Sequence, residues 1–253
     1  MMTERQAAFR ESYRRQIAPL YNGPLHVAVI YAIGLAALWY AAQHVHSPSW
    51  AEWLTIPAVF LIGNVLEWAM HRFVMHRPVK GLMGIYKRHT LAHHQFFTDK
   101  EPSFDDTRDF RIVFFPPYAL LTSVALSAGG AALVGWLWST NAAALLVCTT
   151  TGLYLNYELF HYCCHVKDDA WVRHIPFINT IRRHHIAHHN TSIMMERNMN
   201  LTYPIADWLF GTSDLDRGVL GHLFNGYDTR YVKTDLKKTR ASSDAPLRAV
   251  PGN

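Results

Sequence analysis

The chain has 253 residues, a formal net charge of +5, 50% hydrophobic and 17% charged residues, three Cys and sixteen His. Soluble domains carry about 25% charged residues, so this chain is poor in charge. Three Cys exclude a small disulfide-rich secreted scaffold and a zinc-finger array, and 13 Phe, 8 Trp and 12 Tyr exclude disorder.

Four stretches nearly free of charge follow the basic N-terminal segment, residues 1–23. They are residues 24–42, residues 53–70 with Glu67 as the one charged residue, residues 112–138 and residues 141–157. A transmembrane helix needs roughly 20 apolar residues, so each stretch can span a bilayer. We therefore predict an all-α polytopic membrane protein with about four transmembrane helices. The membrane-embedded domain is expected at 24–236, before a flexible basic tail at 237–253.

The third stretch could form either one tilted helix or a re-entrant hairpin. Its 27 uncharged residues would form a helix of about 40 Å, which is long for an upright crossing. Pro116–Pro117 predict an interfacial entry or a kink near its start. We favour one tilted helix, and Gly129–Gly130 leave a shallow re-entrant hairpin as the alternative.

The basic residues indicate how the chain is oriented. All 24 Lys and Arg lie in 1–15, 71–111 and 167–253, and the linkers 43–52 and 138–141 contain none. With four spans, this positive-inside pattern places both termini and a helical cap in the cytoplasm, under a bacterial inner membrane or the endoplasmic reticulum. A soluble all-helical core is the less favoured alternative.

Two groups of His follow the second and fourth stretches. The first is His71, His76, His89, His93 and His94, and the second is His161, His165, His184, His185, His188 and His189. His161 and His165 share a helix face at i,i+4, as do His89 with His93 and His185 with His189. Imidazole is the commonest protein ligand for metals, so the two groups predict a His-rich di-metal site.

Acidic and aromatic residues accompany these histidines. Glu67 and Glu158 lie inside apolar helices, where an acid is costly without a partner, and Tyr154 shares a predicted face with Glu158. We expect these three to orient ligands or to ligate. The remaining histidines are expected to be surface residues or interface anchors: His26, His44, His46, His174 and His222.

Other site chemistries fit less well. Glu158 and His161 form an ExxH motif, but a ferritin-like di-iron bundle needs a second such motif and two further Glu. The basic residues flank predicted spans, where lipid headgroups are a simpler partner than nucleic acid. A divalent-metal transporter or sensor remains a non-enzyme alternative, although transporters place their ligands near the bilayer midplane.

The order and spacing of the histidines resemble those of the fatty acid hydroxylase/sterol desaturase superfamily. The resemblance rests on four boxes: His71-x4-His76, His89-x3-His93-His94, His161-x3-His165 and His185-x2-His188-His189, and on the segment from Asn200 to Thr212. It covers residues 60–215. The family's fused cytochrome b5 domain is absent, and three residues separate His89 from His93 where fatty acid 2-hydroxylases usually have two.

The resemblance implies an O2-dependent di-iron hydroxylase that acts on fatty-acyl or sphingolipid chains. A desaturase, or a sterol, carotenoid or lipid-headgroup oxygenase, is the alternative within the superfamily. It implies ten ligands, namely all the histidines of the two groups except His184. Either His184 or His185 could serve as a ligand in the fourth box; we favour His185 and expect His184 beside the ligands or facing the substrate. Zn²⁺ is expected to replace iron in some preparations. A separate cytochrome b5- or ferredoxin-type protein with its reductase would supply electrons. The aromatic residues expected to line the substrate path, or simply to pack at the interface, are Phe73, Phe96, Phe97, Tyr157 and Phe160.

Overall fold

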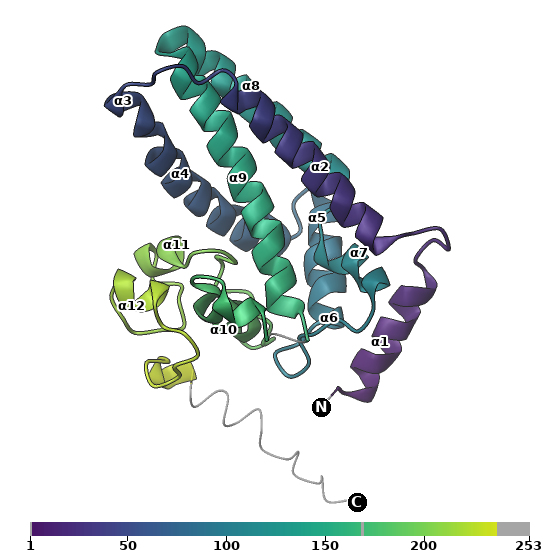
Figure 1. The fold of residues 1–253 in the computed structure, drawn as a ribbon. Coiled ribbons are helices and arrows are strands. Elements are labelled where there is room, and N and C mark those ends of the chain that lie inside the picture. The colour runs from purple at the N-terminus through teal and green to yellow at the C-terminus, as the bar shows by residue number, and fades with distance from the viewer. Residues whose placement is uncertain (1, 168–169, 237–253) are drawn as a thin grey trace, which may run out of the picture.

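Four long helices form the body of the molecule in the computed structural model, which describes residues 2–167 and 170–236. They are α2 (Gly23–Ala42), α4 (Thr55–Met70), α8 (Pro117–Leu137) and α9 (Thr140–His165). In Figure 1 they form an elongated bundle, and the shorter helices gather at one end of it. Apart from one isolated bridge between Leu215 and Val232, no strand occurs in the described ranges, so the all-α prediction is confirmed.

The shorter elements, except for α3, build the cap at the end of the bundle where the histidines lie. They are α1 (Glu4–Arg15), α3 (Trp50–Trp53, at the opposite end), η1 (His71–Met75), α5 (Met83–Tyr86), η2 (Lys87–His93), α6 (His94–Phe96), η3 (Thr107–Asp109), α7 (Phe110–Val113), η4 (Val172–His174), α10 (Ile178–His188), α11 (Ile205–Leu209) and α12 (Val219–Leu223). Of these, η1 and η2 are π-helices, and η3 and η4 are 3₁₀-helices. The predicted tail, 237–253, lies outside the described residues.

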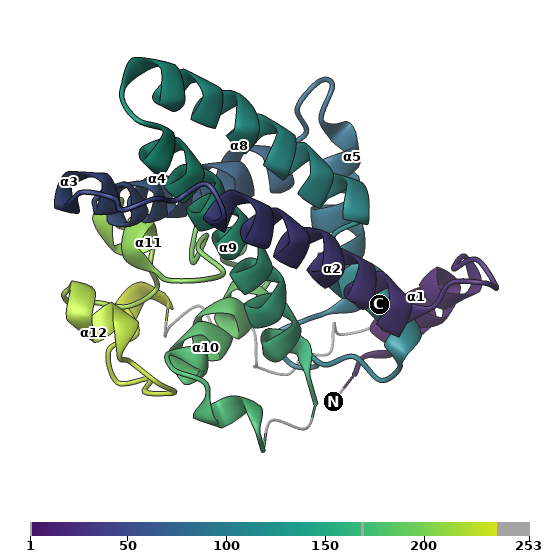
Figure 2. The ribbon, with the colours of Figure 1, turned by 45° about the horizontal axis from the view of Figure 1, so that its top comes forward.

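Helix α9 is the central helix of the bundle. It packs against α2, α4 and α8 and also contacts α10 in the cap, as Figure 2 shows. Small residues permit this close packing, because a Cβ added to Gly34 of α2 would lie 2.6 Å from Leu155 of α9, and one added to Gly63 of α4 would lie 2.6 Å from Leu153. The Ser139 side chain begins α9 by accepting hydrogen bonds from two free backbone N–H groups.

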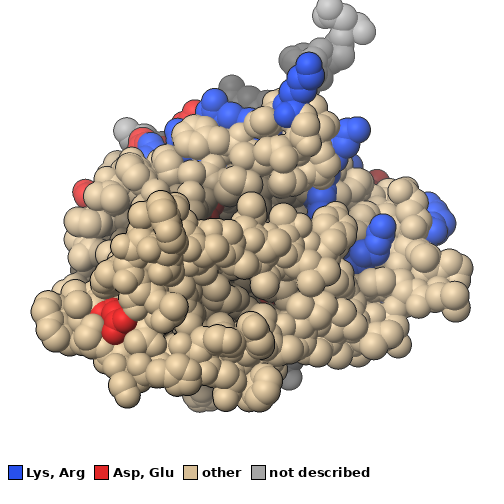
Figure 3. Space-filling view, turned by 90° about the horizontal axis from the view of Figure 1, so that it is seen from above, with Lys and Arg blue, Asp and Glu red and all other residues tan. Residues whose placement is uncertain are grey.

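In the described part of the chain, three segments are long and apolar enough to cross a membrane: Gly23–Ala42, Trp50–Met75 and Thr107–Leu137. The end of the bundle opposite the cap shows Lys and Arg only around its margins (Figure 3), as positive-inside charge predicts. Helix α9 has 26 residues and lies among the other three, but its Thr, Asn and Tyr residues make it more polar. The fourth span and the cytoplasmic position of the cap therefore stay predictions.

The third span is a single helix beyond its prolines. Helix α7 ends at Val113, the chain is extended at Phe114, and α8 then begins with a proline in its first turn and continues past Gly129–Gly130 to Leu137. The predicted break at Pro116–Pro117 is thus present, and the alternative of a broken hairpin is not observed.

The N-terminal helix α1 fastens the cap from outside. The buried Arg10 donates from Nε to the Phe96 carbonyl at 2.8 Å and pairs with Asp105 at 3.2 Å, and Arg14 pairs with the buried Asp109 at 2.5 Å. The Arg10 guanidinium also lies 4.7 Å from the centre of the Phe96 ring. These contacts hold the segment that follows the second histidine box.

Candidate metal centre

Two π-helical turns set the direction of four histidines. Helix α4 changes into η1 at His71, and the His76 N–H donates to the His71 carbonyl at 3.1 Å, which is an i→i+5 hydrogen bond. The His94 N–H likewise donates to the His89 carbonyl across η2. Residues five apart on an α-helix point about 140° away from one another, whereas the wider turn brings them onto one side. Both His pairs therefore face the same space.

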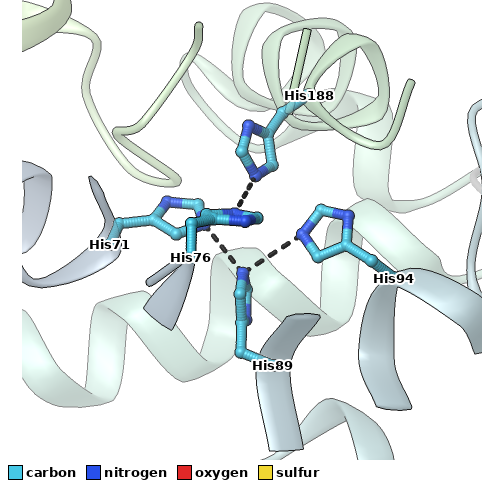
Figure 4. Close-up of side chains that lie close together, drawn as sticks. All are labelled: His71, His76, His89, His94 and His188. Atoms are coloured by element: carbon cyan, nitrogen blue, oxygen red, sulfur yellow. Dashed lines mark hydrogen bonds between the residues drawn. The ribbon is translucent and has the colours of Figure 1, made fainter. Parts of the chain in front are cut away.

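The first cluster contains five buried histidines, His71, His76, His89, His94 and His188, whose candidate ligand atoms all lie within 4.8 Å of one another. Figure 4 shows their rings converging from η1, η2, α6 and α10. The Nε2 atom of His71 is 2.8 Å from that of His89, and the Nε2 atom of His76 is 2.9 Å from that of His188. The Nε2 atom of His94 is 3.1 Å from that of His89.

The second cluster lies directly beside the first and contains His93, His161, His165 and His185. The Nε2 atoms of His165 and His185 are 3.0 Å apart, and those of His161 and His93 are 3.2 Å apart. The Nε2 atom of His189 approaches that of His185 at 3.1 Å, and its ring stacks on the ring of His94 in the first cluster. All ten predicted ligands are therefore brought together, nine in the two clusters and His189 between them.

Helix α10 contributes to both clusters. His185 points to the second cluster and His188 to the first, as residues three apart on neighbouring sides of one helix. His184 points elsewhere: its Nε2 atom lies 2.9 Å from Oδ2 of the fully buried Asp207. The structure thus places His185 in a ligand cluster and His184 beside it, against Asp207.

Hydrogen bonds on the outer side of the rings fix their orientation. The Nδ1 atoms of five ligand histidines face backbone carbonyls: His71 with Met199 at 2.5 Å, His165 with Pro102 at 2.6 Å, His188 with Arg197 at 2.8 Å, His189 with Phe97 at 3.0 Å and His93 with Ile112 at 3.3 Å. A carbonyl can only accept, so each Nδ1 carries the proton. The Nε2 lone pair is then directed into the cluster, which is the tautomer that a metal requires.

Burial keeps these rings uncharged. It lowers the pKa of His89, His93, His94, His185 and His188 well below the ordinary value, and it lowers the pKa of His76 to about 2 and that of His189 to about 3. Nearby imidazoles lower each pKa further, because a second positive charge would be repelled. Neutral imidazoles are the form that coordinates a metal.

This donor set fits two transition-metal ions. Nine imidazole nitrogens converge in two adjacent groups, and neutral imidazole suits iron, zinc, copper and nickel. Buried polar groups normally have a hydrogen-bond partner. Where two imidazole nitrogens face each other, only one proton can lie between them, so inward-facing nitrogens of the clusters are left for a metal to bind. His71, His76, His89, His94 and His188 would hold one ion, and His93, His161, His165 and His185 the other, with His189 at their border.

The predicted acidic residues support the backbone around the site. The Glu67 carboxylate accepts hydrogen bonds from the Leu201 and Thr202 N–H groups at 2.6 and 2.9 Å. The buried Glu158 accepts from the Phe115 N–H at 3.1 Å, and Tyr154 lies beside the Phe115 ring. Neither carboxylate belongs to a ligand cluster among the described residues, so their contacts favour an orienting role over ligation.

The predicted aromatic residues separate into three environments. Phe96 and Phe97 are fully buried, and the Phe97 ring stacks on His165 with centroids 4.0 Å apart. Tyr157 lies between Phe115 and His161, and Phe160 packs on Tyr203. Phe73 is 45% exposed beside Trp68 at the end of α4. Phe97 and Tyr157 therefore touch ligand rings, and Phe96, Phe97 and Phe160 belong to the apolar core.

Sequence reasoning missed a buried polar hub around Asp207. Its carboxylate accepts from the Met199 and Asn200 N–H groups at 2.9 and 2.6 Å and from the Thr212 hydroxyl at 2.5 Å, in addition to His184. Met199 in turn supplies the carbonyl that faces His71. An acid inside the segment Asn200–Thr212, already noted for its resemblance, was the available signal.

Sequence reasoning also missed the ion pair of Arg183 and Asp214, which lies next to the hub. Arg183 donates to both oxygens of the buried Asp214 at 2.7 and 2.6 Å. Asn198, with a positive φ of 58°, links this pair to α10 by donating to the His184 carbonyl and accepting from the Asp214 N–H. The loop after the fourth box is thereby fastened to the ligand helix at several points.

The five histidines without a predicted role lie outside both clusters. His44, His46 and His174 are exposed, and His26 is half-buried between Tyr21 and the Phe115 carbonyl. His222 is only 2% exposed, so its expected surface position is wrong; its Nδ1 faces the Gly218 carbonyl within the cap.

The sequence profile of the family described as fatty acid hydroxylase matches residues 56–212, which include all ten predicted ligands. No curated protein and no solved structure matches the chain.

Proposed function

Because the chain belongs to the fatty acid hydroxylase family, we propose that it is a membrane di-iron oxygenase that hydroxylates a fatty-acyl or sphingolipid-type chain. One observation carries the proposal: two adjacent clusters of buried imidazoles lie at the end of an apolar helical bundle. In the proposed reaction, one oxygen atom of O2 enters a C–H bond, and the other leaves as water with two electrons and two protons.

The protein's own groups prepare the site for this chemistry. The carbonyls of Met199, Pro102, Arg197 and Phe97 orient the ligand rings, and burial keeps the rings neutral and limits access of water. Two iron ions bound by these rings would supply the activation of O2 and the oxidation of an unreactive C–H bond.

Position at the bundle end supports a lipid substrate. The spans adjoining the clusters expose apolar side chains such as Leu61, Ile62 and Leu66, and an acyl chain in the bilayer would lie beside them. We place this end on the cytoplasmic side because the basic segments gather there. A separate cytochrome b5- or ferredoxin-type donor would reach it from the water phase.

The direct test is lipid analysis of cells with and without the gene. We expect a lipid that gains one oxygen atom and disappears in the variant H161A/H165A. The control is H44A, because His44 is exposed and distant from the ligand clusters in sequence. Loss of two hydrogens would replace hydroxylase by desaturase. Metal uptake without any O2-dependent product would support the transporter alternative instead.

A further inference from the structure

A cleft of about 550 Å³ opens where two spanning helices begin. One side is formed by residues 20–29 at the start of α2, and the other by Pro116, Pro117 and Tyr118 at the start of α8. Arg88 and Arg111 line it from the cap. The cleft is separate from the histidine clusters, although Arg88 directly precedes His89 in η2.

Neither guanidinium group forms an ion pair within the described residues, although the carboxyl group of Glu158 acts electrostatically on Arg88. Arg88 donates from one terminal nitrogen to the carbonyls of Arg111 and Phe114, and the Arg111 guanidinium lies 5.8 Å from the centre of the Tyr13 ring. Within residues 2–167 and 170–236, no carboxylate forms an ion pair with either arginine. An anion bound between the two guanidinium groups would offset their positive charges.

The rest of the cleft is open and mostly apolar, with Tyr21, Asn22 and His26 as its polar members. Leu25 is 61% exposed and Tyr118 is 69% exposed, and Val29 and Pro117 continue the lining. Leu25 and Val29 belong to the span Gly23–Ala42, and Tyr118 belongs to the span that ends at Leu137. These side chains would face lipid tails at the depth where a headgroup meets the hydrocarbon.

We propose that this cleft binds an anionic membrane lipid. Its phosphate lies between Arg88 and Arg111, and its acyl chain follows Leu25 and Val29 along α2. A free phosphate ion would use the arginines but leave the apolar lining without a function. The proposal goes beyond the hydroxylase activity and does not depend on it, because it concerns binding outside the ligand clusters.

The test measures retained lipid by native mass spectrometry. The protein is purified in detergent with equal amounts of phosphatidylglycerol and phosphatidylcholine. We expect the wild type to keep phosphatidylglycerol in preference, and R111Q to bind it about tenfold more weakly because a charge-assisted contact is lost. R111Q keeps the backbone carbonyl that Arg88 uses. The matched control R77Q removes an exposed arginine that lies near Phe73 and outside the cleft, and should bind like the wild type.

A second variant tests the proposal even if R111Q folds poorly. L25E places a negative charge at an exposed site in the first turn of α2, where an acid is compatible with the helix dipole, and should also weaken binding of phosphatidylglycerol. Equal retention of phosphatidylcholine, unchanged binding in both R111Q and L25E, or an equal loss in R77Q would overturn the proposal. Release of the lipid by millimolar inorganic phosphate would assign the cleft to a free anion and would also overturn it.

Discussion

Replacement of Asp207 tests whether the buried hub supports the metal ligands. The carboxylate accepts four hydrogen bonds, from the backbone of Met199 and Asn200 and the side chains of Thr212 and His184, and it is 0% exposed. In D207N the amide oxygen can still accept hydrogen bonds. The NH2 group can only donate, and it faces N–H or O–H groups that also donate. At about 1–3 kcal/mol for each buried group left unpaired, we expect a loss of about 2–4 kcal/mol in the free energy of unfolding.

The effect on metal binding follows from one further contact. Met199 carries the carbonyl that orients His71, and loss of such an outer partner typically weakens metal binding about 10–100-fold. The assay is iron per chain at buffered free iron concentrations, together with thermal unfolding in detergent. D228N is the control, because Asp228 pairs with Arg230 at the surface and should change neither result. If D207N lowers Tm but binds iron as tightly as the wild type, the proposed link from Asp207 to His71 is refuted.

Three further predictions concern the clusters, the bundle and the buried ion pair. H76A/H188A should lose the iron of the first cluster and H161A/H165A that of the second, so elemental analysis should find about half of the wild-type iron in each; complete loss in either would show that the clusters do not load independently. G34L should destabilise the bundle by about 1–3 kcal/mol because its side chain would overlap Leu155. G129A should not, because a Cβ added at Gly129 meets no atom within 4 Å, and equal Tm values for the two variants would contradict this packing. Burial raises the pKa of Asp214, but the contacts with Arg183 outweigh it and leave the pKa lowered; the stabilisation is therefore complete above the ordinary carboxyl pKa of about 3.9 and is lost as pH falls through the lower folded pKa. The Tm difference between wild type and D214N should accordingly be constant near neutral pH and shrink in acid, and a difference independent of pH would count against the ion pair.

Much of this arrangement follows from local patterns that a sequence displays. Charge segregation marks the apolar helices, and the i,i+4 spacing brings His161 and His165 to one cluster. The division of the second box could not be predicted in the same way. The spacing of His89 and His93 predicts a shared face, and their rings do stack with centroids 5.3 Å apart. It does not predict that His89 joins the first cluster and His93 the second, within the π-helix η2.

The contacts that orient the ligand rings could not be predicted from the sequence for a different reason. Asp207, Asn198 and Met199 act through backbone groups of distant segments, and such pairings depend on tertiary structure rather than on spacing. Glu67 shows the same limit: its position in an apolar helix marked it as important, but only the fold reveals that it holds Leu201 and Thr202. Arg88 and Arg111 of the cleft likewise come close only because α7 packs against η2.

Helix α10 has a consequence for how the two clusters can move. His185 and His188 belong to different clusters, and their ring centroids are 6.2 Å apart. Their separation along the helix is set by a rise of about 1.5 Å per residue, which backbone hydrogen bonds make stiff. Tilting of the bundle in a thinner or thicker bilayer can therefore move both clusters together. The stiffness of α10 keeps the distance between the two clusters nearly constant.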